Sequence, residues 1–250
     1  MSERILIGIP CPILGGYRPF DVALQALMAH HPEARVFYAM TGVVPGARNR
    51  IVREAIRSDA EYVWFLDDDQ PFYPGGIPGR PDDLEALLAH DLDAVIPLSP
   101  RRGAPFLPLL YDRIREEGWM AAQRYLTPED QGLIPVAGAG MAGLLIKVSV
   151  LRAMGDDGWF EFVHPPTNFD DYSEDLPFYK KLSAHGVQLY CDLDVRFGHA
   201  VTAVAYIVRN AGQWQTVLAD HDPFVAFPQP VHPLSVPRAA PTRKQLVTVS

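Results

Sequence analysis

Short apolar runs alternate with helix-type patterns over the first hundred residues of the chain. The runs at 4–10, 35–40, 61–66 and 94–98 are almost wholly apolar, which predicts buried β-strands. Between them, the segments 20–30, 47–57 and 82–90 space apolar side chains three and four positions apart, which predicts helices. Strands that alternate with helices favour a mainly parallel sheet with helices on its faces. We therefore expect an α/β fold.

The regular alternation lapses after residue 100. We expect a strand at 106–111, a small-residue segment at 138–143 that leads into a strand at 144–146, and a short helix from Val148. A further helix is expected over 173–186, with Ser173 as N-cap and Gly186 as its stop, followed by a strand at 188–197. Proline is frequent beyond residue 220. We expect one domain over 1–220 and an irregular C-terminal tail over 221–250.

Composition is that of an ordinary globular protein, with 48% hydrophobic and 21% charged residues in 250. There is no run of eighteen apolar residues and no signal-peptide pattern at the N-terminus, so we expect a cytoplasmic protein without a transmembrane segment. Cys11 and Cys191 are far apart and lack zinc-site spacing. Both are expected to be buried apolar residues.

The formal net charge of −8 disfavours a large nucleic-acid footprint, because such footprints rely on basic side chains. A local basic patch such as Arg101 and Arg102 remains compatible with one. A nucleic-acid acceptor is therefore a less favoured alternative to a glycan or small molecule. An acidic protein can still bind a diphosphate if a metal ion supplies the positive charge.

Three consecutive carboxylates follow the apolar run at 61–66. Asp67, Asp68 and Asp69 would repel one another unless a cation lies among them. The spacing of Asp67 and Asp69 lets both side chains point to one side, toward a hard divalent ion. The alternative is an exposed acidic turn that caps the next element. The strand before the acids favours the metal interpretation.

Two further candidates come later in the chain. Glu174 and Asp175 open the predicted helix at 173–186, where acids are also common for capping and helix-dipole reasons alone. His199 follows a glycine at the end of the last predicted strand, and a single histidine there is more often structural than a ligand. Neither observation carries a function by itself.

Taken in order, these motifs resemble glycosyltransferase family 2 and its phage and bacterial relatives of GT-A fold. The matching segments are ARNRIVREA, YVWFLDDD, GAGMAGLLI, SEDLPFYKKLSAHG and LDVRFGH, within roughly residues 4 to 200. The resemblance implies a Rossmann-like, mainly parallel sheet and a metal-dependent transfer of sugar from a nucleotide-sugar donor. A UDP-sugar is the first expectation for that donor, with Mn²⁺ or Mg²⁺ as the cofactor.

The resemblance also implies roles for individual residues. The donor would be contacted by Pro10, Arg48, Asn49, Asp67, Asp68 and Gly140. Asp69 would bind the metal, with Asp67 beside the ribose and metal and with His199 as a further ligand. Asp175 would be the general base of an inverting reaction, and Glu174 is the second candidate. Gly138, Gly140 and Gly143 would either let the backbone approach the sugar or serve packing alone.

Several alternatives stay open. The stretch 39–42 lacks the acidic residue with which many relatives hold uracil, so the nucleobase is not fixed. An aromatic group comprises Trp159, Phe160, Phe162 and His164, for which core or loop packing is favoured over a sugar platform. A nucleotidyltransferase would need a glycine-rich basic loop, and only Gly15, Gly16 and Arg18 suggest one. A non-catalytic sugar-nucleotide-binding module is the third possibility.

Overall fold

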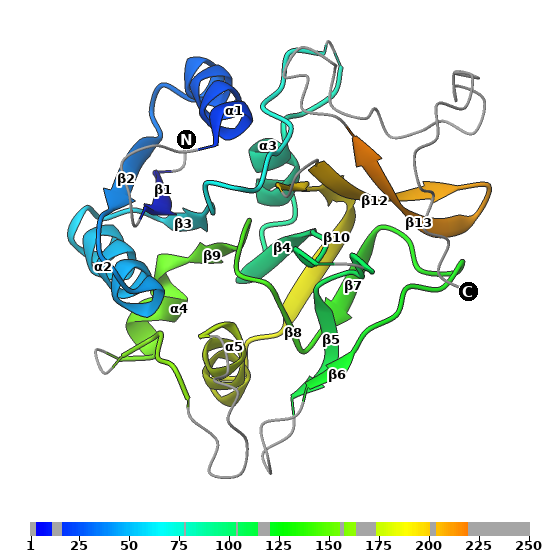
Figure 1. Ribbon diagram of the computed structural model, residues 1–250. Helices are drawn as coiled ribbons and strands as arrows, with labels where there is room; N and C mark the ends of the chain where they lie inside the picture. Colours follow the sequence, from blue (N-terminus) through cyan, green and yellow to red (C-terminus); the bar gives the residue numbers. More distant parts are fainter. Residues whose placement is uncertain are drawn as a thin grey trace.

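The computed structural model describes residues 4–11, 17–77, 79–103, 105–114, 121–155, 158–163, 174–200 and 204–219. Its centre is a seven-stranded sheet in the order β2-β1-β3-β9-β4-β10-β7 (Figure 1). These strands are β1 (Ile5–Pro10), β2 (Arg35–Ala39), β3 (Tyr62–Phe65), β4 (Ala94–Leu98), β7 (Leu133–Val136), β9 (Leu145–Lys147) and β10 (Leu189–Arg196). β1, β2, β3, β4 and β10 share one direction, and β7 and β9 oppose them. The expected α/β fold with a mainly parallel sheet is confirmed.

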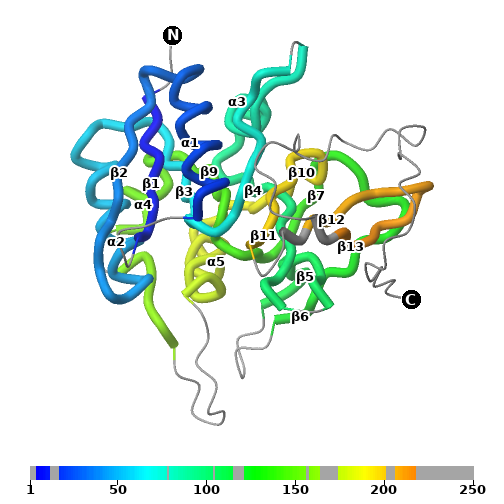
Figure 2. The backbone as a smooth tube through the Cα atoms, turned by 45° about the horizontal axis from the view of Figure 1, so that its top comes forward, coloured from blue at the N-terminus to red at the C-terminus, as the bar shows by residue number. Residues whose placement is uncertain are grey.

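Helices cover both faces of the sheet and bury two apolar clusters. They are α1 (Arg18–His30), α2 (Val44–Arg57), α3 (Asp83–Leu88), α4 (Val148–Ala153) and α5 (Asp175–Ala184). α1 and α3 pack on one face, where Phe20, Leu27 and Trp64 are fully buried. α2, α4 and α5 pack on the other face (Figures 1 and 2). The apolar spacing in each helix therefore faces the sheet, as the sequence predicts.

Two small antiparallel sheets adjoin the central one. One comprises β5 (Leu110–Ile114), β6 (Ala121–Gln123) and β8 (Gly138–Ala139), and the other β11 (His199–Ala200), β12 (Val204–Asn210) and β13 (Gln213–Ala219). β12 and β13 form a hairpin whose tip residues, Ala211 and Gly212, both have positive φ. β6, β7 and this hairpin were not predicted from the sequence.

Three predicted boundaries need correction. α2 begins at Val44 and includes Pro45 and Gly46, because proline is tolerated in the first helical turn, where its missing N–H has no partner. The strand predicted at 106–111 lies at 110–114, since Phe106 has φ +54° and cannot continue an extended strand. The N-cap position of α5 is Glu174. Ser173 lies outside the described residues, as does the predicted tail at 221–250.

The two cysteines and the lengths of the helices bear on the remaining predictions. Cys11 and Cys191 are buried, as predicted, and form no disulfide. Burial raises the pKa of the Cys191 thiol well above its usual value, so it stays protonated within the core. Within the described residues, none of the helices has the length and apolarity needed to cross a bilayer.

Candidate functional site

The three aspartates lie where the sheet opens, directly after β3. Backbone hydrogen bonds fix this loop, because the N–H of Gln70 donates to the carbonyl of Asp67 and the N–H of Ala200 donates to that of Asp69. A third bond joins the N–H of Tyr17 to the carbonyl of Asp68. The loop is thereby tied to β11 and to the start of α1, and its side chains stay directed toward the carboxyl edge of the sheet.

Arg48 of α2 links this loop to the start of α5. Its Nη2 atom lies 3.1 Å from both carboxylate oxygens of Asp67, and its Nη1 atom lies 2.7 Å from Oδ1 of Asp175. Nη1 also donates to the carboxylate of Glu174. The Arg48 side chain is only 4% exposed. Burial alone would lower its pKa, but the three carboxylates raise the pKa above its ordinary value, so the guanidinium is charged.

The charges around Arg48 do not balance. One guanidinium faces three carboxylates, and the Glu174 side chain is almost fully buried while those of Asp67 and Asp175 are only 25% and 19% exposed. Partly buried carboxylates in excess of cations attract a further positive charge or a proton. Of the two acids on α5, Asp175 is the more accessible and can meet a ligand more readily than Glu174.

Asp69 contacts a second set of side chains, Arg102 and His199. Its Oδ2 atom lies 3.6 Å from Nε2 of His199 and accepts a hydrogen bond from the guanidinium of Arg102. Burial would raise the pKa of Asp69, but His199 and Arg102 lower it below the ordinary value. Asp69 is therefore ionised. Arg102 was considered in the sequence only as part of a basic patch, and its contact with Asp69 was not anticipated.

His199 is oriented by its other ring nitrogen. Nδ1 lies 2.9 Å from the carbonyl oxygen of Pro100, an acceptor, so Nδ1 carries a proton and Nε2 faces Asp69. Burial would lower the pKa of His199, but Asp69 and the Pro100 carbonyl raise it. A ring whose second nitrogen donates to a carbonyl is the usual arrangement of a metal-ligating histidine. The pair of Asp69 and His199 therefore fits a divalent cation.

Another carboxylate–histidine cluster has a structural explanation. Within the described residues, three potential ligand atoms lie within 4.8 Å of one another only at His31, Asp82 and Glu85. Asp82 is the N-cap of α3 and forms a capping box with Glu85, while its Oδ2 atom lies 2.7 Å from Nε2 of His31. The backbone N–H groups of Asp82 and Glu85 and the ring of His31 occupy these carboxylate oxygens, so we assign no metal to them.

Of the other predicted donor residues, some lie at the carboxyl edge of the sheet and some contact other parts of the protein. Pro10 ends β1 beside Ala39 of β2. The amide of Asn49 exchanges two hydrogen bonds with the backbone of Phe160, at 2.8 and 3.0 Å. Asp68 is half-buried, and burial together with Asp69 and Asp67 raises its pKa. Asn49 therefore anchors the segment around Phe160.

Packing accounts for two of the small residues. At Gly143, φ is +85° and an added Cβ would lie 2.2 Å from the ring of Pro97. At Gly140, an added Cβ would lie 2.5 Å from Leu109, and the carbonyl of Gly140 accepts a hydrogen bond from the Tyr179 hydroxyl. A side chain at Gly143 would collide with Pro97 and one at Gly140 with Leu109, which favours the packing interpretation of these glycines.

The aromatic group near residue 160 divides between core and surface. Trp159 is buried and its indole N–H donates to the carbonyl of Leu151. Phe160 stacks on Phe178 of α5 with 4.4 Å between ring centroids. Phe162 is 43% exposed, and His164 lies outside the described residues. Trp159 and Phe160 are thus core residues.

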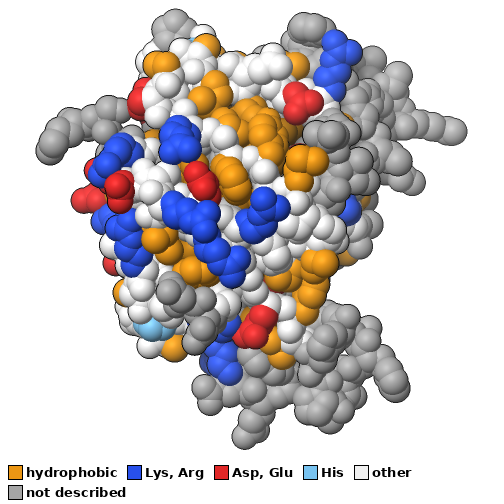
Figure 3. All heavy atoms as spheres, turned by 90° about the vertical axis from the view of Figure 1, so that its left-hand side faces the viewer, with side chains coloured by type: hydrophobic (Ala, Val, Ile, Leu, Met, Phe, Trp, Pro, Cys, Tyr) orange, Lys and Arg blue, Asp and Glu red, His pale blue; other side chains and the backbone are white. Residues whose placement is uncertain are grey.

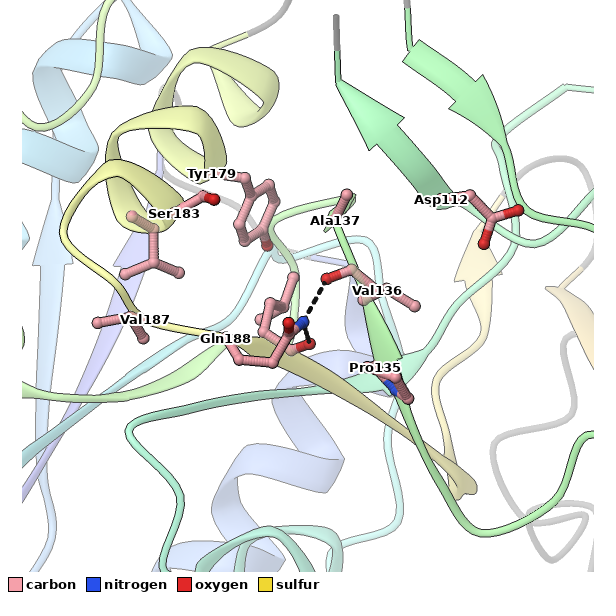
Figure 4. A pocket seen from close by; sticks show the side chains of 10 residues that line it. Asp112, Pro135, Val136, Ala137, Tyr179, Ser183, Val187 and Gln188 are labelled. Atoms are coloured by element: carbon pink, nitrogen blue, oxygen red, sulfur yellow. Dashed lines mark hydrogen bonds between the residues drawn. The ribbon is translucent and has the colours of Figure 1, made fainter.

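A cavity of about 310 Å³ lies beside α5, and none of the acids that contact Arg48 lines it. Figure 4 shows Tyr179 and Ser183 of α5 on one side of it and Asp112 of β5 on the other. The amide of Gln188 is already bonded to the carbonyls of Val136 and Leu189. Ser183 is eight residues beyond Asp175, about 12 Å along the helix. The cavity therefore does not belong to the candidate site.

The side of the molecule that carries α2 and β2 has Lys and Arg side chains among hydrophobic ones (Figure 3). Arg50, Arg53 and Arg57 are exposed on α2. The net charge of −8 is thus unevenly distributed. This basic surface is compatible with an anionic partner.

No family model and no curated protein matches the chain. Among solved structures, A197 from STIV is similar, with a TM-score of 0.51 and 15% sequence identity over 87% of this chain and 95% of that one. A 4-diphosphocytidyl-2C-methyl-D-erythritol synthase structure has a TM-score of 0.40 at 10% identity, over 77% of this chain and 90% of that one. The nucleoside-diphosphate-sugar pyrophosphorylase from Vibrio cholerae RC9 has a TM-score of 0.39 at 10% identity, over 76% and 91%. The first likeness shows the fold alone, and the other two are too weak to carry an argument.

Proposed function

We propose that this chain is a metal-dependent glycosyltransferase that moves a sugar from a nucleoside diphosphate to an acceptor hydroxyl. The observation that carries the proposal is the convergence of three separate segments at the carboxyl edge of the sheet. Asp67 meets the acids of α5 through Arg48, and Asp69 meets His199. Capping of the next element, the alternative role for these aspartates, does not account for either contact.

Asp69 and His199 would hold Mn²⁺ or Mg²⁺, because one supplies an ionised carboxylate and the other an imidazole nitrogen directed toward it. Such an ion neutralises the charge that grows on a departing diphosphate. Arg102 already contacts Asp69 and is exposed, so it can move to the donor phosphates when the carboxylate binds the ion. The donor would be a nucleotide sugar, with a UDP-sugar as the first to test.

Asp175 would act as general base. It is more accessible than Glu174, and Arg48 fixes the direction of its carboxylate through the bond to Oδ1. In this role Asp175 accepts the proton of the acceptor hydroxyl while that oxygen attacks the anomeric carbon opposite the leaving diphosphate. The bond from carbon to the diphosphate oxygen breaks in the same step, which inverts the anomeric centre. Glu174, almost fully buried against Arg48, would hold the guanidinium in place.

Product analysis separates this proposal from nucleotidyl transfer. The protein is incubated with Mn²⁺ and either a UDP-sugar or UTP plus a sugar 1-phosphate. Release of UDP from the first mixture, without pyrophosphate from the second, is the expected result. Pyrophosphate release with no nucleoside diphosphate from the sugar nucleotide would reject glycosyl transfer in favour of nucleotidyl transfer.

A nucleic acid is the second candidate for the acceptor, because exposed arginines lie on one side of α2. Arg50, Arg53 and Arg57 would meet phosphates there, and each phosphate contact makes binding weaker as salt concentration rises. Binding of duplex DNA measured at 50 and 200 mM salt tests this candidate. Binding that is absent, or that does not change between the two salt concentrations, would leave a glycan or small molecule as the acceptor.

A further inference from the structure

A second cavity, of about 290 Å³, lies between the β12–β13 hairpin and the segments that flank β5 and β6. Its walls include Leu107, Pro108, Tyr125, Trp214 and Thr216, and none of the described residues that line it is charged. A neutral, aromatic and partly polar cavity does not suit a phosphate, a carboxylate or a metal ion. It suits an uncharged ligand with both apolar and hydroxyl-bearing surfaces.

The two aromatic side chains in the cavity differ in how they are held. Tyr125 is 62% exposed, and within the described residues its hydroxyl has no hydrogen-bond partner. The ring of Trp214 is fixed, because its indole N–H donates to the carbonyl of Thr127 at 3.1 Å and the guanidinium carbon of Arg196 lies 5.5 Å from the ring centroid. An exposed tyrosine ring beside a fixed tryptophan ring offers an aromatic surface on which an uncharged ligand can pack.

The backbone connects this cavity to the candidate transfer site. Pro108 in the cavity wall forms a β-bridge with Pro100, whose carbonyl orients His199. The N–H of Arg101 donates to the carbonyl of Leu107 at 2.9 Å, which holds the two segments side by side. β11 carries His199 and pairs with β12 of the hairpin. The wall of the cavity is therefore joined directly to the segment that orients His199.

We propose that this cavity is a subsite for a neutral sugar unit of the acceptor, which makes the acceptor a glycan or glycoside. The apolar face of a pyranose ring packs against the Tyr125 and Trp214 rings. Its hydroxyl groups meet the Tyr125 hydroxyl and the oxygen of Thr216, which donates to the carbonyl of Phe106 and can still accept. This inference rests on the proposed glycosyl transfer, since it names the acceptor class of that same reaction.

Binding can be tested on the full-length protein by saturation-transfer NMR and by titration with maltose, cellobiose, lactose and chitobiose. The variant Tyr125→Ala removes the exposed ring, and Tyr125→Phe removes only the hydroxyl. Phe162→Ala is the matched control, because Phe162 is another exposed aromatic residue that lies outside this cavity. Each variant is also titrated with UDP and Mn²⁺, which reports on the donor site separately.

We expect at least one disaccharide to bind, with affinity lowered about ten-fold by Tyr125→Ala and about three-fold by Tyr125→Phe. Phe162→Ala should change nothing. Failure of all four sugars to bind, equal binding by Tyr125→Ala and the parent, or a loss confined to Phe162→Ala would each overturn the subsite. Sugar binding that depends on Tyr125 without any response to UDP and Mn²⁺ would reject transfer from a UDP-sugar while the sugar site stands.

Discussion

The guanidinium of Arg48 lies 3.1 Å from both carboxylate oxygens of Asp67, although the two residues come from different elements of the fold. The same guanidinium reaches Glu174 and Asp175, more than 120 positions further along the chain. α2, the loop after β3 and the start of α5 are thus joined by one buried cation. The position of Asp175 depends on this contact.

Replacement of Arg48 should destabilise the fold severely. Arg48→Met leaves three carboxylates facing each other without their cation, and the loss of one partner of a buried ion pair costs about 3–5 kcal/mol of unfolding free energy. Urea denaturation measures the loss. Arg53→Met, an exposed position on the same helix, is the control and should stay within about 0.5 kcal/mol of the parent. Equal stability of the two variants would mean that the Arg48 contacts contribute little.

Part of this arrangement could be predicted from the sequence. Arg48 precedes Ile51 by three positions and Val52 by four, so it lies on the apolar stripe of α2 and must be buried. That pattern indicates a buried arginine with carboxylate partners, while the donor contact that the resemblance implies for Arg48 stays a prediction. The identity of its partners could not be predicted, because Glu174 and Asp175 meet it only through the packing of α5 on the sheet.

Part of the fold could also be predicted from the sequence, and part could not. β1 to β4 and the helices between them follow from apolar periodicity, which depends on burial against one sheet. The β12–β13 hairpin was missed because its two-residue tip, between Asn210 and Gln213, is Ala211–Gly212, and alanine at a positive φ is not a usual hairpin signal. β6 and β7 are short strands of three and four residues, so their local pattern is too weak to separate from loop.

Separate substitution of Asp175 and Glu174 should show which of the two acids is the general base. Asp175→Asn keeps the shape of the side chain but removes the proton acceptor, so we expect sugar transfer to fall about 10²–10⁴-fold while donor affinity is retained. Glu174→Gln should reduce transfer less. Rates and donor affinities of both variants are compared under one set of conditions. A greater loss in Glu174→Gln, at matched thermal stability, would reverse the assignment.

His199 should contribute to metal affinity and contribute little to donor binding in the absence of metal. His199→Gln removes the imidazole that faces Asp69, so Mn²⁺ affinity should fall about 10–100-fold, as measured by calorimetric titration. His90→Gln is a matched control, because His90 also pairs with an aspartate, at 2.7 Å from Asp192, outside the site. If Mn²⁺ bound His199→Gln and the parent equally, the proposed metal pair would be wrong.

Asp83 should make stability depend on pH. Burial raises the pKa of Asp83 to about 7, although the Tyr73 N–H and Arg80 act in the opposite direction. The native state then binds more protons than the unfolded state between about pH 4 and 7, so this group's contribution to stability is present at low pH and lost as pH rises through 7. Asp83→Asn still offers an oxygen to the Tyr73 N–H, which Asp83 Oδ2 accepts at 2.6 Å.

The variant should therefore gain up to roughly 4 kcal/mol over the parent at pH 8 and nothing at pH 4. Urea denaturation across this pH range measures the difference, and the exposed Asp59→Asn serves as control. A constant difference between Asp83→Asn and the parent at all pH values would show that Asp83 does not titrate in this range.

Binding of sugar nucleotides with and without metal tests the central claim most directly. Thermal stabilisation is measured with UDP-, GDP-, dTDP- and CMP-sugars in Mn²⁺, Mg²⁺ or EDTA, for the parent and for Asp69→Asn. We predict stabilisation by one donor class, which disappears in EDTA and in Asp69→Asn. Stabilisation by no sugar nucleotide, or stabilisation that is equal in EDTA and in the variant, would contradict a metal-dependent donor site at Asp69.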